Sequence, residues 1–293
     1  MPSVNVVNGK QIVVENLGPG ERLLRFFAKP FARMWHHRDL IQAILRREVA
    51  ERFKGSIAGW VWAVVAPLLA IAVYTFFFAG KLDLPPEFII TSSPNTNYAL
   101  FILSGIIVFN FWSEMAFRAP MLLHEYVHFI KQTIFPSDML AMISTLRATL
   151  YTVISIAVLL IFQFIVVGSL PWTVLLLPLI FIPFVAFVVG MSWFLCAVGA
   201  FTRDAGYLMI NIVPLFMFAT PIFYSHTSLP PPWNLVIYLN ALTGYVDVMR
   251  DIMLLGKLPN WPVYAWTLFT SFVTFYLGYW FFDRYRNVIV DVI

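Results

Sequence analysis

The feature that most constrains this chain is a series of apolar stretches long enough to cross a lipid bilayer. A membrane-spanning helix needs roughly 20 predominantly apolar residues to cross about 30 Å of hydrocarbon. The composition agrees with such spans, because 60% of the 293 residues are hydrophobic and only 12% are charged, against about 25% charged in soluble domains. We therefore predict an all-α polytopic membrane protein with six transmembrane helices, at residues 57–80, 98–118, 141–168, 172–199, 205–225 and 262–282.

Two of the connections between these stretches have distinctive patterns. The third and fourth stretches meet at Gly168-Ser169-Leu170-Pro171, which predicts a tight turn and a helical hairpin. Between the fifth and sixth, two apolar patches at 233–243 and 245–255 are interrupted by Pro and Gly, and each is too short to cross. This pattern predicts a pair of re-entrant or interfacial half-helices within residues 230–257.

The distribution of basic residues predicts the orientation in the membrane. Sixteen of the 19 Lys and Arg residues lie before residue 57, within 118–147, in the turn at 199–205 or after residue 282. The other side has only Lys81, Arg250 and Lys257. Because cytoplasmic segments are enriched in Lys and Arg, we expect both termini in the cytoplasm. The net charge of +4 then reflects topology and contact with anionic membrane lipids, and no nucleic acid is expected as a partner.

The N-terminal part precedes the first stretch and divides into two. Residues 1–35 form a cytoplasmic extension whose end is basic and aromatic. Residues 36–56 read as an amphipathic interface helix, because Leu40, Ile41, Ile44, Leu45 and Val49 fall on one half of a helical wheel. This helix could anchor the chain at the membrane surface, or act as a lever that a cytoplasmic partner pushes. Residues 57–285 are the transmembrane domain and residues 286–293 a cytoplasmic tail.

One short motif suggests a different function. His124 to His128 read H-E-x-x-H, which on a helix places two imidazoles on one face as zinc ligands beside a glutamate base. The motif follows Arg118 and Pro120, beyond the end of the second stretch, whereas a catalytic zinc needs a third ligand and a protected site. We expect no metal here, and an intramembrane zinc protease remains the distant alternative. The single cysteine, Cys196, lies in an apolar run and excludes an internal disulfide.

Several segments together resemble the permease subunits of type-2 ABC exporters that move bacterial surface polysaccharides. The resemblance covers roughly residues 38–285, although the family's usual Asn-Pro is Asn240-Ala241 here. The segments are Arg47-Glu48, the run 52–56, Gly59-Trp60 with Pro67, Phe129-Ile130-Lys131 with Phe135-Pro136, the run 201–225, and Leu239-Asn240-Ala241 followed by 247–251.

The resemblance implies a homodimer of six-span subunits in the bacterial inner membrane, joined by two copies of a separate ATPase. The substrate it implies is a lipid-linked polysaccharide, with O-antigen favoured and capsular polysaccharide or teichoic acid as alternatives. A type-2 ABC exporter of drugs or lipids is a more distant one. The chain has no G-x-x-x-x-G-K-[ST] phosphate loop. We therefore expect a transport subunit that is not an enzyme and holds no cofactor, with ATP and magnesium bound by the partner.

Three sets of candidate site residues follow. The loop 119–139 and the helix before it are expected to contact the ATPase, through Tyr126, Phe129, Ile130, Lys131, Arg47, Glu48, Glu51 and Arg52. Aromatic residues that could stack on sugar rings define a substrate channel: Trp60, Trp62, Tyr74, Phe77, Phe111, Trp112, Phe223 and Tyr224, with Met217 in the same run. The half-helices supply an external gate of Asp247, Arg250 and Asp251.

Each set also has a plainer interpretation. The loop helix could lie on the lipid surface, and Trp and Tyr gather at membrane interfaces in any case. Asp247, Arg250 and Asp251 have the spacing of local ion pairs. Glu114 and Arg118, one helical turn apart, could neutralise each other near the end of the second stretch.

Overall fold

The computed structural model describes residues 3–7, 10–14, 19–52, 54–78, 88–90, 94–132 and 136–293. The chain divides into two compact units, residues 1–43 and residues 44–293. In the first unit, strands β1 (Ser3–Val7) and β2 (Lys10–Val14) pair in antiparallel register, with Ser3 opposite Val14. Helix α1 (Pro19–His36) follows. The β-hairpin departs from the all-α prediction, which holds for the described residues after it.

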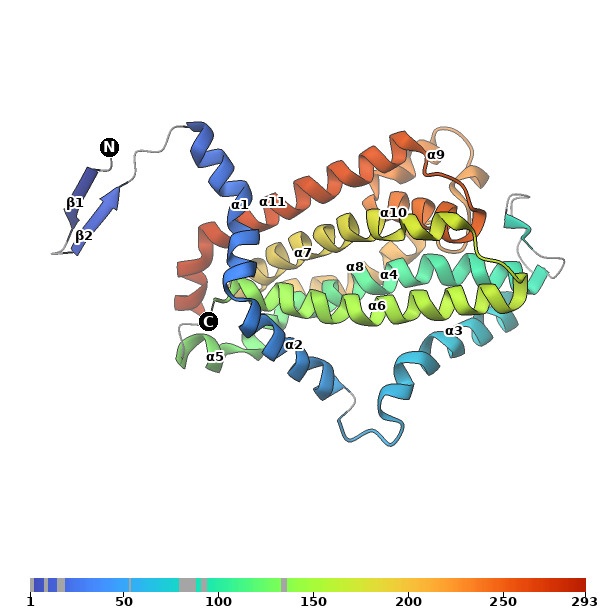
Figure 1. Ribbon diagram of the computed structural model, residues 1–293, viewed down its shortest axis with the longest axis horizontal. Helices are drawn as coiled ribbons and strands as arrows, with labels where there is room; N and C mark the ends of the chain where they lie inside the picture. Colours follow the sequence, from blue (N-terminus) through green and yellow to red (C-terminus); the bar gives the residue numbers. More distant parts are fainter. Residues whose placement is uncertain are drawn as a thin grey trace. The chain divides into compact units, whose positions relative to one another are not determined.

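Helix α2 (Arg38–Arg52) begins in the first unit and continues into the second. It lies within the predicted amphipathic helix 36–56. Among the described residues, every regular element of the second unit is a helix (Figure 1). Its elements are η1 (Gly59–Val61), α3 (Trp62–Phe78), α4 (Pro94–Glu125), α5 (Val127–Gln132), α6 (Asp138–Val167), η3 (Trp172–Leu176), α7 (Leu177–Phe201), α8 (Asp204–Ala219), η4 (His226–Ser228), α9 (Trp233–Val236), η5 (Ile237–Leu239), α10 (Ala241–Arg250), η6 (Asp251–Leu255) and α11 (Trp261–Val292).

Four described helical segments are long and apolar enough to cross a membrane: Gly59–Phe77, Asn97–Glu125, Asp138–Val167 and Trp172–Phe201. The protein is therefore a polytopic membrane protein with at least these candidate spans. Helix α8 is apolar but has only 16 residues. Helix α11 has 32 residues, and its last part carries several charged side chains. Crossing by α8 and α11, and thus the total of six, stays a prediction. The end of the first predicted span, residues 79–80, lies outside the described residues.

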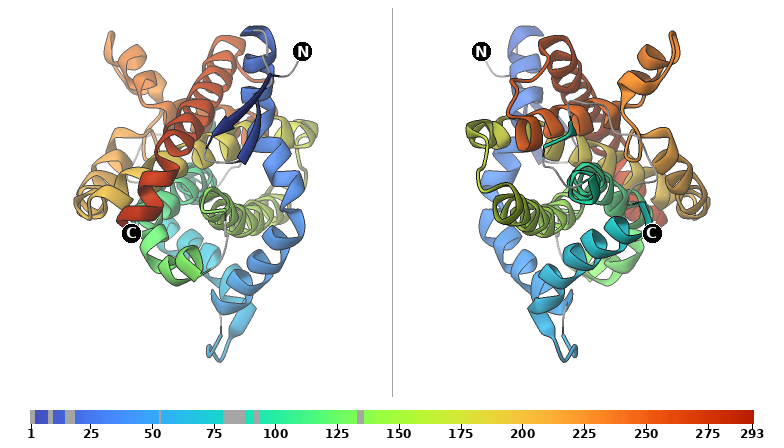
Figure 2. Two further views of the ribbon diagram at one scale, coloured as in Figure 1. Left: turned by 90° about the vertical axis from the view of Figure 1, so that its left-hand side faces the viewer. Right: turned by 90° about the vertical axis from the view of Figure 1, so that its right-hand side faces the viewer.

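Helix α4 is the centre of the second unit. It contacts α3, α6, α7, α8 and α10, and the end-on views show it enclosed by other helices (Figure 2). In its apolar window 83% of the residues are buried, whereas the window in α3 is only 11% buried. Helix α3 touches α4 and α6 but leaves most of its apolar surface exposed. In a membrane protein, such a surface faces lipid or another subunit.

Helices α7 and α11 pack so closely that their main chains are in contact. A Cβ atom added at Gly278 would lie 1.9 Å from the carbonyl oxygen of Gly190, and one added at Gly190 would lie 2.3 Å from that of Thr274. Only glycine permits this approach, as is common where helices pack inside membranes. Gly199 allows a similar contact between α7 and Pro120 of α4.

Local sequence explains where several helices begin and end. Helix α6 ends at Gly168, which adopts φ of 81° and so accepts the left-handed conformation that closes the predicted tight turn. Helix α10 begins at Asn240, whose side chain accepts a hydrogen bond from the Leu242 amide. The predicted patches 233–243 and 245–255 fold as the short elements α9, η5, α10 and η6. Whether they enter the bilayer stays a prediction.

Candidate functional site

The two segments predicted to contact an ATPase meet in the structure. Tyr126, in the turn between α4 and α5, donates its hydroxyl hydrogen to Glu48 Oε1 of α2 across 2.6 Å. Glu48 is only 4% exposed. Burial, together with the hydrogen bond to the Glu48 carboxylate, raises the pKa of Tyr126 far above its ordinary value. The phenol therefore remains a donor throughout the neutral range, and α2 is fixed to the α4–α5 turn.

Around this hydrogen bond the predicted coupling residues form a small surface. The Phe129 ring lies 6.1 Å from that of Tyr126 and under the guanidinium of Arg47, 5.7 Å away. Arg47 also pairs with Glu51 at 2.8 Å. Phe129 is 46% exposed, Lys131 is exposed and Ile130 is buried. We call Arg47, Glu51, Phe129 and Lys131 the coupling surface. Arg52 is also exposed, but it pairs with Glu114 of α4. Arg47 and Glu51 lie on α2, and Phe129 and Lys131 lie on α5.

Next to this surface lies a cluster of acidic and basic side chains from three helices. Arg118 of α4 lies 3.5 Å from Glu48, and Arg147 of α6 lies 3.6 Å from the same carboxylate. Glu114 of α4 pairs with Arg147 at 3.1 Å and with Arg52 of α2 at 2.9 Å. We call these five residues the charged cluster. The expected pairing of Glu114 with Arg118 is wrong, because the folded chain places partners from other helices closer to both.

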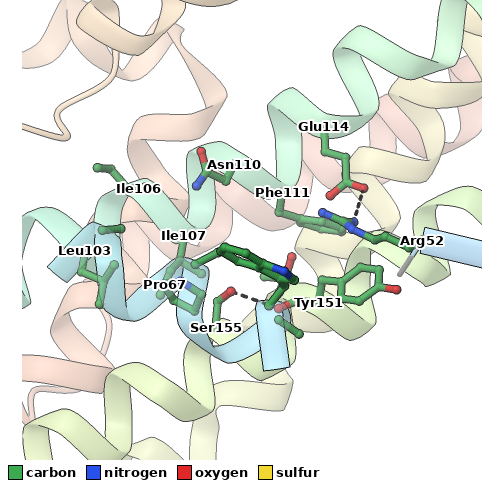
Figure 3. A pocket seen from close by; sticks show the side chains of 15 residues that line it. Arg52, Pro67, Leu103, Ile106, Ile107, Asn110, Phe111, Glu114, Tyr151 and Ser155 are labelled. Atoms are coloured by element: carbon green, nitrogen blue, oxygen red, sulfur yellow. Dashed lines mark hydrogen bonds and ion pairs between the residues drawn. The ribbon is translucent and has the colours of Figure 1, made fainter. Parts of the chain in front are cut away.

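The charged cluster opens into a cavity of about 310 Å³ between α3, α4 and α6 (Figure 3). Arg52 and Glu114 form its charged end, with the Arg52 guanidinium 4.0 Å from the centre of the Tyr151 ring. Asn110 of α4 and Ser155 of α6 line its middle. Helix α3 closes the cavity with Trp62, Pro67 and three alanines. We call it the inner cavity. It combines aromatic, hydroxyl and amide groups in a largely apolar helix bundle.

The predicted channel aromatics are dispersed. Trp60, Trp62 and Phe77 are 52%, 46% and 57% exposed along α3 and η1, while Tyr74 is half-buried. Phe111 and Trp112 are buried inside the chain: Phe111 packs on Phe181 and Phe184, and Trp112 stacks on Phe216. Met217, Phe223 and Tyr224 are half-buried near the end of α8. Only Trp62 and Phe111 of this set line the inner cavity.

The predicted external gate residues have unequal roles. Arg250 is 1% exposed and donates to the carbonyl oxygens of Pro221, Ile222 and Phe101 at 2.7, 2.8 and 3.1 Å. Its guanidinium also lies 3.7 Å from the centre of the Phe101 ring. Arg250 therefore fixes α10 to α4 and to the segment after α8. This replaces the local ion pairs that its spacing from Asp247 and Asp251 allowed.

The two histidines of the H-E-x-x-H motif lie on different helices. Helix α4 ends at Glu125 and α5 begins at Val127, so the two histidines do not share one continuous helix. His124 contacts the carbonyl oxygen of Gly199 at 3.2 Å, and Glu125 pairs with Arg118 at 3.4 Å. Throughout the part of the chain that the structure describes, no three His, Cys, Asp or Glu side chains gather as metal ligands. Cys196 is a buried free thiol.

Sequence reasoning missed Arg147 and Arg118 as members of the site. In the sequence, Arg147 is distinguished only as one of the basic residues within 118–147. The signal available was an arginine within an apolar stretch, which is costly in a bilayer and needs a partner. The structure supplies that partner from α2, which is far away in the sequence.

The fold defines a class, a helical multi-pass membrane protein. In this protein α2 contacts the α4–α5 turn next to the charged cluster. Residues 39–254, well over half of the chain, match the family model described as ABC-2 type transporter, and the chain belongs to that family. Subunits of this family transport and do not catalyse a reaction.

Curated relatives extend the comparison. The chain is 25% identical over 259 residues to the O-antigen export system permease protein RfbA of Klebsiella pneumoniae, covering 87% of this chain and 95% of that protein. It is 21% identical over 230 residues to the protein of the same name from Myxococcus xanthus, covering 78% and 85%. It is also 22% identical over 253 residues to the polysialic acid transport protein KpsM of Escherichia coli, covering 81% and 90%.

Proposed function

We propose that this chain is the membrane subunit of an exporter that moves a lipid-linked polysaccharide across the bacterial inner membrane. Two similar proteins are named for O-antigen export and one for polysialic acid transport. O-antigen is the favoured cargo, with capsular polysaccharide or teichoic acid as the alternatives. In this proposal two copies form the conduit, each copy crosses the membrane six times, and both termini lie in the cytoplasm. The membrane subunit itself holds no cofactor.

Energy comes from two copies of a separate ATPase that bind ATP and magnesium. The observation that supports coupling is the hydrogen bond from Tyr126 to Glu48. The ATPase docks on the coupling surface, where an aromatic ring and several charges are exposed next to one another, as at many interface hot spots. Force on α5 then reaches α2 directly through this bond.

The charged cluster carries the movement further. Glu48 contacts arginines of both α4 and α6. Glu114 of α4 forms an ion pair with Arg52 at the end of α2, so α2 and α4 are linked a second time. A displacement of α2 therefore changes the pairing of two candidate spans at once. Rearranged ion pairs at a helix interface are a recognised means of switching between two packed states.

The inner cavity, which lies between the same helices, has a lining that suits a carbohydrate or its lipid carrier. Sugar hydroxyls need polar partners, which Asn110 and Ser155 provide, and the apolar faces of sugar rings suit the Trp62 indole. Trp60 of η1 and Phe77 of α3 are exposed, and in this proposal they face the second copy.

Co-purification tests this proposal. The chain is expressed with the ATPase encoded beside it, extracted in detergent, and examined for mass and ATP hydrolysis, and surface polysaccharide is measured in cells. A two-plus-two complex that hydrolyses ATP, with polymer at the cell surface, supports the proposal. A complex that hydrolyses ATP but moves lipids or drugs in place of polymer would contradict the substrate. A chain that purifies alone with stoichiometric zinc would contradict the whole proposal.

A further inference from the structure

Helix α1 of the first unit has a narrow basic face. An α-helix turns about 100° per residue, so residues three or four positions apart lie on the same side. Basic residues recur along α1 with this spacing and fall within a sector of about 80°. We call them the basic face of α1: Arg25, Lys29, Arg33 and His36.

The opposite side of α1 is apolar and aromatic. Phe27, Phe31, Met34 and Trp35 lie there. Phe31 and Trp35, which are neighbours on the helix surface, are 55% and 72% exposed, and Phe27 and Met34 are half-buried. Large apolar side chains that stay exposed next to one another mark a surface that contacts lipid or another molecule.

The charge of α1 is unbalanced. Residues 19–36 contain four Lys and Arg residues, and Glu21 is the only acidic residue among them. Four positive charges against one negative charge leave an excess of three. An excess of positive charge therefore remains on α1 even where some of its basic side chains have partners.

Helix α2 differs from α1 in its charges and contacts. It carries Asp39, Glu48 and Glu51 among its arginines, and Glu48 accepts the hydrogen bond from Tyr126. The two helices are nevertheless joined without a loop. The His37 amide donates to the Arg33 carbonyl oxygen at 3.0 Å, and the Ile41 amide donates to the His37 carbonyl oxygen at 2.9 Å. The direction of α1 therefore sets that of the first turn of α2.

The two faces of α1 define the chemistry of a partner. A basic face opposite an apolar aromatic face is typical of a helix that lies in the plane of a membrane interface. The apolar side enters the boundary between headgroups and acyl chains, and Lys and Arg contact anionic lipids. An acidic protein surface would complement the basic face alone. Only α2 and a short connection separate α1 from the first candidate span, Gly59–Phe77, so the bilayer is always close.

We infer that α1 binds the surface of an anionic lipid bilayer. Phe31 and Trp35 enter the boundary between headgroups and acyl chains, and the basic face contacts the lipid phosphates. This binding is a further interaction of the chain and does not depend on the cargo or on the ATPase. Because α1 continues into α2, the lipid surface also orients the start of the helix that carries Glu48.

Spin labels in the full chain test this inference. A label is attached at Phe31→Cys on the apolar side or at His36→Cys on the basic face. Cys196 is a buried free thiol, and the wild-type chain treated in the same way gives the background. The labelled chains are placed in nanodiscs of phosphatidylcholine alone, or of equal parts of phosphatidylcholine and anionic phosphatidylglycerol. Collisions with oxygen, which concentrates in lipid, and with a water-soluble nickel chelate report the surroundings of each label.

The expected result is a difference between the two lipids and between the two faces. In anionic nanodiscs the label at Phe31→Cys should collide with the nickel chelate at least about threefold less often than in neutral ones, and more often with oxygen. The label at His36→Cys should stay accessible to the chelate in both. Salt at about 1 M, where the screening length is about 3 Å, should reduce the difference between the lipids.

Charge variants separate lipid recognition from simple insertion. Arg25→Gln combined with Arg33→Gln, in the Phe31→Cys chain, should lower the ratio of membrane-bound to free α1 at least about fivefold, since two positive charges are lost. Arg25→Lys combined with Arg33→Lys keeps both charges and is the matched control. It should leave this ratio within about twofold of the parent chain.

Three outcomes would overturn the inference. The label at Phe31→Cys could be equally open to the chelate in both lipids, which would place α1 in water. It could be shielded from chelate and oxygen alike, which would bury it in protein. Shielding that is equal in both lipids and unchanged in the Gln variant would show insertion without recognition of anionic lipid. None of these outcomes affects the proposed function, which co-purification and export test separately.

Discussion

The hydroxyl oxygen of Tyr126 lies 2.6 Å from Glu48 Oε1, although 78 positions separate the two residues in the chain. Glu48 is nearly inaccessible to solvent, and the same carboxylate faces two arginines. A short loop helix and an amphipathic N-terminal helix are thereby held in one arrangement, and force applied to either of them acts on both.

Replacing Tyr126 with Phe should uncouple ATP hydrolysis from export. The variant keeps the ring beside Phe129 but removes the hydrogen bond to Glu48, which is worth about 1.5–3 kcal/mol for a charged acceptor. We expect polysaccharide at the cell surface to fall several-fold while the purified complex still hydrolyses ATP. Replacing Tyr126 and Phe129 together with Ala should abolish export. Unchanged export in both variants would remove the coupling role of this turn.

Replacing Glu114 with Gln should destabilise the junction of α2, α4 and α6. The change leaves Arg147, whose side chain is 12% exposed, and Arg52 without a shared carboxylate. Breaking a fully buried pair costs about 3–5 kcal/mol, and the partial exposure of Arg52 reduces the expected cost to about 2 kcal/mol. The melting temperature in detergent measures this loss. Glu51→Gln is the control, since its pair with Arg47 is exposed on both sides and should contribute nothing measurable.

Replacing Arg250 with Lys should destabilise the α10 end despite keeping the positive charge. A lysine ammonium cannot reproduce the planar fork that reaches Pro221, Ile222 and Phe101 together. Carbonyl oxygens left unpaired in a buried site cost about 1–3 kcal/mol each. We expect a clear fall in melting temperature for Arg250→Lys and a larger one for Arg250→Met. Arg284→Lys, at an exposed position of α11, serves as the control. Equal melting temperatures would show that these contacts contribute little.

Replacing Gly190 with Ala should disrupt the α7–α11 interface. The new methyl group would lie 2.3 Å from the Thr274 carbonyl oxygen and 2.5 Å from the Phe275 Cα atom, and main-chain atoms cannot rotate away as a side chain can. Overpacking of this kind costs about 1–3 kcal/mol or more. At Gly206 the same substitution meets only the flexible end of Met121, at 3.0 Å, so Gly206→Ala should be tolerated. Thermal unfolding of the two variants in detergent gives the comparison directly.

The sequence predicts best those structural features that depend on a single segment of the chain. Apolar length was sufficient to predict the first four spans, and Gly168 with Pro171 was sufficient to predict the turn between two of them. Helix α11 is long, but several charges follow its apolar part, so length and composition alone do not establish that it crosses. The paired strands β1 and β2 have no counterpart in the prediction, because two five-residue strands give a weak pattern.

The site depended on contacts between distant segments, which spacing along the chain cannot reveal. Glu114 and Arg118 have ideal spacing for an ion pair, yet Arg52 and Arg147 approach Glu114 from other helices. Arg250 likewise donates its hydrogen bonds to main-chain carbonyl oxygens of residues at least 28 positions away in the sequence, although Asp247 and Asp251 are close to it in the sequence. The spacing of the H-E-x-x-H pattern likewise does not reveal that α4 ends at Glu125, between the two histidines.

The glycine contact between α7 and α11 also limits how the chain can change shape. Two helices joined backbone to backbone cannot slide by one turn without passing a side chain through the contact, so we expect them to remain one rigid body during transport. Helix α3, with an apolar window only 11% buried, has no comparable restraint among the described residues. In the proposed exporter we therefore expect α3 to move when the conduit opens, while α7 and α11 act as a fixed support.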